Sequence, residues 1–250
     1  MKKLLENTVI EYLFPELPST LHMMCNKISK PPKMLVGLPI GYSLENVYPI
    51  FVFLNGGAGA AGVQSDIEYV KKLTGNKYFI SVSLPLFKNE VDPNEFLNGI
   101  FINASDDYQI ISSSYKIMLS KLFDEIPNID KGNGVIAGFS NGGNTIALLL
   151  SNVDNFILDN FTNFVLWEGG LVIMSFNKLK VNSKNFLYVI GDKNDTASRK
   201  RIANIGKSLR EEVIDFTGAN IDVIKMHGIG HEHPDEYIPV IRNWVMEKIK

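Results

Sequence analysis

A serine flanked by glycines at residues 138–142 is the feature of this sequence best suited to chemistry. The segment reads Gly138-Phe-Ser140-Asn-Gly142, with a short apolar run before it and a helix-like apolar stretch after it. Glycines two residues either side of the serine allow a tight strand-to-helix turn, because no Cβ crowds the backbone. Such a turn raises the hydroxyl above the sheet and directs helix N-terminal amides at a reacting carbonyl. The segment therefore predicts Ser140 as a nucleophile.

A nucleophilic serine needs a histidine base and a carboxylate that orients the base. Without them, Ser140 is more simply read as an ordinary turn residue. Both residue types follow it in the sequence: the apolar run 186–191 leads into Asp192 and Asp195, and the run 221–226 opens into a loop that contains His231. An acid and a histidine at the carboxyl ends of neighbouring strands, in this chain order, are what a nucleophile elbow requires.

More than one carboxylate can be the acid. Asp192 and Asp195 share one loop, and either side chain can instead cap the helix expected after it. Glu168 ends the strand-like run 164–167 and offers a carboxylate from the neighbouring strand. Trp167, just before it, is expected in the core.

Three of the four histidines lie close together, at His227, His231 and His233. We expect His231 to be the base, because His227 lies too near the end of the strand and Pro234 turns His233 away. Together with Glu232 these imidazoles suggest a zinc site as an alternative. No recognised metal-ligand spacing is present, however, and structural zinc normally takes four ligands. We therefore expect no metal.

The apolar run 50–54 ends in the glycine-rich segment Asn55-Gly-Gly57. A tetrahedral intermediate needs backbone N–H donors for its oxyanion, and glycines let the main chain approach closely. Beside the serine turn, this segment predicts that the amides of Gly57 and Asn141 form an oxyanion hole. Taken alone, it also fits a flexible loop after a strand.

Strand-like and helix-like segments alternate along the chain. Strands are expected at 34–38, 50–54, 78–84, 134–137, 164–167, 186–190 and 221–226. Helices are expected at 63–73, 107–125, 144–151, 198–213 and 235–249. This alternation indicates an α/β fold with a parallel sheet. Residues 1–33 are expected to be irregular or to form a hairpin at the sheet edge, and the aperiodic stretch 87–106 to border the site as a loop.

Composition fits one domain spanning residues 1–250. The chain is 45% hydrophobic, which is enough for a sizeable core, and its net charge of -2 does not favour a nucleic acid partner. Cys25 is the only cysteine, so an internal disulfide is excluded and a reducing compartment is favoured. No run is long and apolar enough for a membrane span, and the amino terminus lacks the apolar region of a signal peptide. We expect a cytoplasmic protein.

Residues 35–248 resemble the α/β-hydrolase superfamily, closest to the esterase group of carboxylesterases and acyl-thioesterases, feruloyl-esterase-like and polyester-depolymerase-like enzymes. The stretches that carry the resemblance are 38–42 with the strand and turn 49–59, 138–143, 191–195 and 228–231. The resemblance implies an α/β-hydrolase fold, with a mostly parallel sheet of about eight strands and helices on both faces. It also implies no large cap domain, because Ser140 and Asp195 lie close in the sequence.

The resemblance assigns roles to particular residues. It implies Ser140 as nucleophile, Asp195 as acid, His231 as base, and the amides of Gly57 and Asn141 as oxyanion hole. Asp195 is favoured over Asp192 because the family's acid usually falls three or more residues after the glycine that ends the strand. The chain departs from the family at Asn55, where a histidine is usual. This departure concerns the geometry of the loop more than the triad.

The function expected from these residues is hydrolysis of a small-molecule carboxylic ester or thioester through an acyl-enzyme, with no cofactor. Two alternatives stay open. The same residues can pass the acyl group to an alcohol or amine, as in an acyltransferase, or the fold can serve in binding without catalysis. The identity of the substrate and the oligomeric state are not determined by the sequence.

Overall fold

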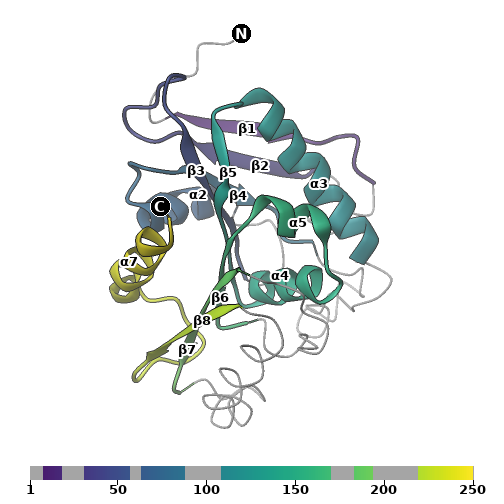
Figure 1. The fold of residues 1–250 in the computed structure, drawn as a ribbon. Helices are drawn as coiled ribbons and strands as arrows, with labels where there is room; N and C mark the ends of the chain where they lie inside the picture. The colour runs from purple at the N-terminus through teal and green to yellow at the C-terminus, as the bar shows by residue number, and fades with distance from the viewer. Residues whose placement is uncertain are drawn as a thin grey trace.

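Eight strands form a single sheet in the computed structural model, which describes residues 8–18, 31–56, 63–87, 108–169, 183–193 and 219–249 (Figure 1). The strands are β1 Val9–Leu13, β2 Lys33–Gly37, β3 Tyr48–Leu54, β4 Ile80–Leu84, β5 Ile129–Phe139, β6 Asn163–Trp167, β7 Asn185–Gly191 and β8 Asn220–Met226. Their order across the sheet is β1-β2-β4-β3-β5-β6-β7-β8. The expected loop at 87–106, from residue 88 on, and the expected helix at 198–213 lie outside the described residues.

The sheet is mostly parallel, as the sequence predicts. All the pairs formed among strands β3 to β8 are parallel. Strand β1 pairs antiparallel with β2, and β2 pairs antiparallel with β4. The antiparallel pair occupies the edge at which the sequence suggests an irregular segment or a hairpin. Because the carboxyl ends of parallel strands meet at one edge of the sheet, residues that follow β5, β6, β7 and β8 are brought together.

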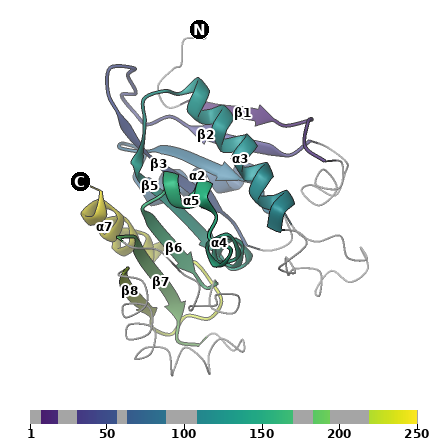
Figure 2. The same ribbon diagram turned by 45° about the vertical axis from the view of Figure 1, so that its right-hand side comes forward.

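Helices cover both faces of the sheet. They are α2 Val63–Thr74, α3 Tyr108–Glu125, α4 Asn141–Ser151, α5 Asn155–Asn160 and α7 Ile238–Lys248, with a 3₁₀ turn, η3, at Asp235–Tyr237. Helices α3, α4 and α5 pack on one face, and α2 and α7 on the other (Figures 1 and 2). Each face has its own apolar core, so the central strands are buried on both sides. This explains why their sequences are continuous apolar runs without alternation.

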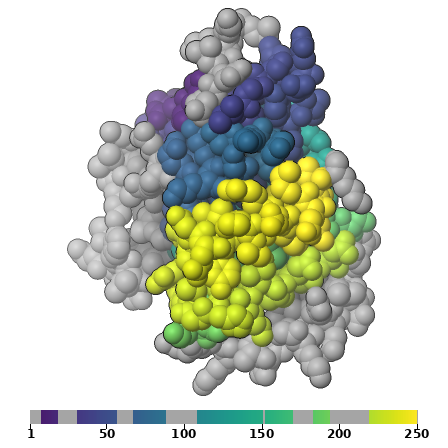
Figure 3. Space-filling model, turned by 90° about the vertical axis from the view of Figure 1, so that its left-hand side faces the viewer, coloured from purple at the N-terminus to yellow at the C-terminus, as the bar shows by residue number. Residues whose placement is uncertain are grey.

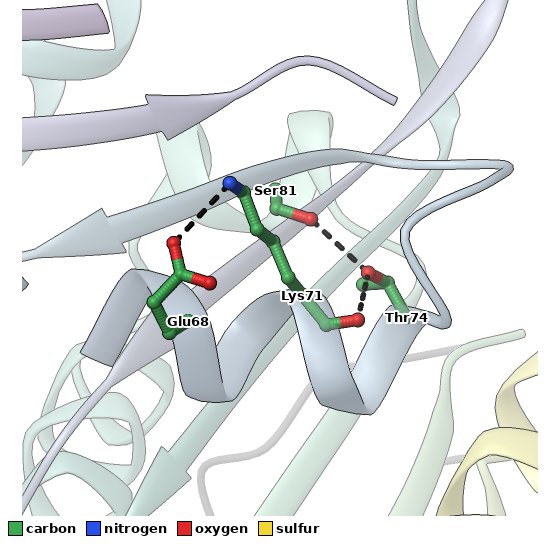
Figure 4. Close-up of polar contacts among 4 residues, drawn as sticks. All are labelled: Glu68, Lys71, Thr74 and Ser81. Carbon is green, nitrogen blue, oxygen red and sulfur yellow. Dashed lines mark hydrogen bonds and ion pairs between the residues drawn. The ribbon is translucent and has the colours of Figure 1, made fainter. Parts of the chain in front are cut away.

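Polar contacts tie α2 to the sheet and to the neighbouring helix α7. At the end of α2, the Thr74 hydroxyl lies 3.1 Å from that of Ser81 on β4, and both residues are buried (Figure 4). On the outer side, the Nε of Arg242 in α7 donates to the carbonyl of Leu73 at 3.0 Å, and its guanidinium also donates to that of Lys72. Helix α7 lies directly beside α2 on this face (Figure 3).

Two elements, β5 and α4, begin three or more residues earlier than the sequence indicates. Strand β5 begins at Ile129 and not at 134, because its first residues pair with Tyr48 and Pro49 across a register shift in β3. Helix α4 begins at Asn141 and not at 144, directly after the serine. Helix α5 was not expected; the side chain of Asp154 caps it by accepting the Ile157 amide at 3.0 Å. None of the helices in the described ranges is long and apolar enough to cross a bilayer.

Candidate active site

Ser140 occupies the sharp turn between β5 and α4. Its φ of 51° and ψ of -114° lie in a region that side-chain-bearing residues rarely adopt. The two flanking glycines make the turn possible, since a Cβ on Gly138 would overlap the backbone of Gly142, and one on Gly142 would overlap the carbonyl of Leu54. A strained backbone at the junction of a buried strand and a helix is the local geometry of a nucleophile elbow.

Backbone hydrogen bonds hold this turn from two sides. The amide of Ser140 donates to the carbonyl of Trp167, at the end of β6, at 2.8 Å. The Ser140 carbonyl accepts the amide of Asn144 in α4 at 3.0 Å. The neighbouring strand and the following helix therefore both set the direction of the serine side chain.

The imidazole of His231 contacts the hydroxyl of Ser140. The distance from Nε2 to Oγ is 2.8 Å, although the two residues belong to the loops after β8 and β5. The ring of Phe139 supports the imidazole, with the ring centroids 5.3 Å apart and the planes inclined by 34°. The pair has the geometry of a nucleophile and its general base.

A buried carboxylate lies on the other side of this imidazole. The Oε2 atom of Glu168, directly after β6, is 3.6 Å from Nδ1 of His231. Its Oε1 atom accepts the amide hydrogen of Gly191, the last residue of β7. The Glu168 side chain is fully buried, whereas that of His231 is partly exposed.

The carboxylate of Asp192 faces a different histidine. Its Oδ2 atom lies 3.1 Å from Nδ1 of His227, and its Oδ1 atom accepts the amide hydrogen of Gly228 at 2.8 Å. The hydrogen bond from Gly228, helped by the contact with His227, lowers the pKa of Asp192 below its ordinary value. Asp195, the acid expected from the sequence, lies outside the described residues.

The loop after β3 lies against the serine turn. A Cβ on Gly56 would come within 2.8 Å of the Cβ of Ser140, so this loop approaches the elbow closely. The side chain of Asn55 accepts the Gly56 amide at 2.7 Å and so shapes the start of the loop. Asn141, one of the two expected oxyanion donors, is the first residue of α4 and is buried. Gly57, the other, lies outside the described residues.

Comparisons with known proteins find similarity in structure only. No protein-family model matches the sequence, and no curated protein matches it. The structure is similar to that of the Bacillus cereus carboxylesterase, with 16% identity, a TM-score of 0.61, and coverage of 92% of this chain and 100% of that one. It is also similar to an S-formylglutathione hydrolase from Agrobacterium tumefaciens, with 14% identity, a TM-score of 0.63, and coverage of 97% and 95%. A thermophilic esterase from Thermogutta terrifontis matches with 13% identity, a TM-score of 0.61, and coverage of 88% and 90%.

The chain has the α/β-hydrolase fold. Identities this low, over nearly the full length of these proteins, establish the architecture and leave the activity to the residues of the site. The fold class expected from the sequence is therefore confirmed, and the described residues contain no inserted cap domain.

An open pocket of about 330 Å³ adjoins His231 in this hydrolase fold. It is lined by Phe139, His231, Glu232, His233 and Pro234. The ring of His233 packs edge-on against Phe139, with centroids 4.6 Å apart, and also lies 4.7 Å from the ring of Tyr69. His233 therefore forms part of the pocket wall. The sequence did not indicate this role, because Tyr69 comes from the distant helix α2.

The three clustered histidines have three different neighbours in this hydrolase fold. His227 contacts Asp192, His231 contacts Ser140 and His233 packs among aromatic rings. Among the residues that the structure describes, no three His, Cys, Asp or Glu side chains are grouped so that they could hold a metal ion.

Proposed function

We propose that this protein is a serine hydrolase that cleaves a small-molecule carboxylic ester or thioester through an acyl-enzyme. The observation that carries the proposal is the 2.8 Å contact between Nε2 of His231 and Oγ of Ser140, with the serine on a strained turn at the head of a helix. An imidazole at this distance can take the hydroxyl proton as the oxygen attacks.

In the first half of the reaction, Ser140 Oγ attacks the carbonyl carbon while its proton passes to Nε2 of His231. The carbonyl π electrons move to the oxygen, which becomes an oxyanion. The amides of Asn141 and Gly57 are the proposed donors to this oxyanion, because the first amide of a helix after the nucleophile points toward it. Collapse of the intermediate breaks the bond to the alcohol or thiol, which leaves with the proton from Nε2.

In the second half, water repeats these steps on the acyl-enzyme. His231 takes a proton from the water as its oxygen attacks the acyl carbon, and then returns the proton to Ser140 Oγ as the acid departs. The reaction needs no redox cofactor. A carboxylate beside His231 completes the site, and the candidates are Asp195, from the sequence, and Glu168, at 3.6 Å from Nδ1.

The pocket beside His231 is the proposed place of the leaving group. The departing alcohol or thiol must receive its proton from Nε2, so it has to sit against the imidazole. The pocket offers the ring of Phe139 and the ring of His233 to that group. Two structural neighbours are named as a carboxylesterase and an S-formylglutathione hydrolase. The first name refers to carboxylic esters and the second to a thioester, and both support the proposed class of substrate.

A fluorophosphonate probe tests the proposal directly. We expect mass spectrometry to locate one adduct, on Ser140, because only an activated serine reacts readily with such probes. Ser140→Ala should lower kcat on an aryl ester by roughly 10⁴-fold or more, since nucleophile and base act as a unit. Absence of the adduct from folded protein, or an adduct on another serine, would refute the proposal. Adding a competing alcohol or amine distinguishes hydrolysis from acyl transfer by the product formed.

A further inference from the structure

The carboxylate of Glu168 is buried beside the imidazole of His231. The side chain is fully buried, and an ionised carboxylate in such a place must be paired. Its Oε1 atom accepts the Gly191 amide, and its Oε2 atom faces Nδ1 of His231 at 3.6 Å. Nδ1 is the nitrogen that must carry a proton if Nε2 is to accept one from Ser140.

The backbone holds Glu168 firmly in this position. Glu168 has a φ of 52°, so the chain turns sharply at the end of β6 and directs the side chain across the ends of the strands. Its amide donates to the carbonyl of Val189 in β7 at 2.9 Å. On the other side, Gly169 packs so tightly against Ser140 that a Cβ there would overlap the serine carbonyl. The carboxylate and the nucleophile are thus positioned by the same piece of backbone.

The described carboxylate after β7 is engaged elsewhere. Asp192 binds the amide of Gly228 and the ring of His227, at the start of the loop that carries His231. It is therefore placed to shape that loop, and not to contact the imidazole of the base.

We infer that Glu168, at the end of β6, and not a residue of the loop after β7, is the carboxylate that orients His231 and stabilises its protonated form. The inference rests on the proposed function, since it assigns the partner of the proposed base. Glu168 is a positioning residue: it holds the Nδ1 proton toward itself and keeps its own negative charge throughout. The separation of 3.6 Å is longer than a hydrogen bond, and catalytic contacts of this kind often shorten to one when substrate binds.

Three isosteric substitutions separate the candidate acids. Glu168→Gln keeps an acceptor for the Gly191 amide but removes the charge. We expect kcat to fall by roughly 10²–10⁴-fold, because the imidazole loses both its tautomer and the support of its cation. Asp195→Asn and Asp192→Asn are the matched controls and should each change kcat by less than about tenfold.

The split between kcat and KM distinguishes a role in the reaction from a merely structural one. A carboxylate that supports the imidazolium acts in the transition state and not in substrate binding. The loss in Glu168→Gln should therefore fall on kcat, with KM changed by less than about threefold. A loss of kcat/KM that comes mainly from a raised KM would overturn the inference.

Fluorophosphonate labelling of Ser140 in the unmodified protein keeps the two proposals apart. Where the label is found, a loss of 10²-fold or more in Asp195→Asn overturns the assignment of Glu168 but leaves the serine mechanism standing. The same holds if Glu168→Gln stays within about tenfold. Where circular dichroism shows that Glu168→Gln does not fold, Asp195→Asn decides by itself: retained activity supports Glu168, and its loss refutes it.

Discussion

Ser140 and Glu168 share an unusual backbone conformation at the ends of neighbouring strands. Both have positive φ, at 51° and 52°, although neither is a glycine. Such residues cost about 1–3 kcal/mol each and persist only where the surroundings enforce them. Here hydrogen bonds hold both residues in place: the Ser140 amide donates to the carbonyl of Trp167, and the Glu168 amide donates to the carbonyl of Val189 in β7. Two strained turns side by side direct a hydroxyl and a carboxylate toward the same imidazole.

The clustered histidines lead to a prediction at this scale. His231→Ala should abolish turnover, because among the described histidines of this cluster it is the one that contacts Ser140, whereas His227→Ala should retain most of the activity. His227 is the matched control, since its ring lies on the same loop but faces Asp192. Ester hydrolysis assays on purified variants with unchanged circular dichroism measure both effects. Dialysis against a chelator should leave activity intact, and a loss that added zinc restores would contradict the serine mechanism.

At the scale of elements, the loop between β8 and α7 carries both the proposed base, His231, and part of the pocket wall. Its start is fixed by Asp192, through Gly228 and His227, and its far end is continued by η3 into α7. Helix α7 in turn is tied to the end of α2 by Arg242, and Tyr69 of α2 packs against His233. The position of this loop therefore depends on how α2 and α7 pack together.

Substitution of Arg242 tests this link. Arg242→Ala removes the donors that satisfy the last carbonyls of α2, at Leu73 and Lys72, and should lower the free energy of unfolding by about 1–2 kcal/mol. Arg242→Lys is the control: it keeps the charge but not the planar fork, so we expect an intermediate loss. Urea denaturation followed by circular dichroism measures both. Equal stability of Arg242→Ala and the unmodified protein would show that the contact contributes nothing.

At the scale of the whole molecule, one sheet separates two apolar cores. Neighbouring residues of the central strands point to opposite faces: Phe164 and Leu166 of β6 join the core under α3, α4 and α5, while Val165 and Trp167 join that under α2 and α7. Each strand thus belongs to both cores, and neither core can lose its strands without disturbing the other. This arrangement predicts that the two faces unfold together.

Leu122 in α3 allows a test of this coupling. Its side chain is fully buried in the core on the α3 face, whereas both tryptophans, Trp167 and Trp244, lie in the opposite core. Leu122→Ala should lower the free energy of unfolding by about 2–5 kcal/mol through the cavity it leaves. We expect tryptophan fluorescence to report the same shift in midpoint as far-UV circular dichroism. If the unfolding midpoint measured by circular dichroism moves while that measured by fluorescence does not, the two faces unfold separately.

The order of the expected strands and the sharp turn at Ser140 follow from the sequence alone. Apolar runs without alternation indicated strands buried on both faces, and the structure has strands at all seven expected places. The glycines around Ser140 indicated the turn, because their effect is local: they act through backbone atoms a few residues away. The start of β5 was missed, since it depends on a register shift against β3.

Which carboxylate lies beside which histidine at the end of the sheet was decided only by the tertiary structure. The position of His231 in its loop already favours it as the base. The sequence also offers several carboxylates within short loops, however, and nothing in their spacing indicates which histidine each one contacts. The pairing of His231 with Ser140, of His227 with Asp192, and the approach of Glu168 to His231 depend on the order and register of β5, β6, β7 and β8. Contacts between residues far apart in the chain are set by how the strands are placed side by side, which no local pattern contains.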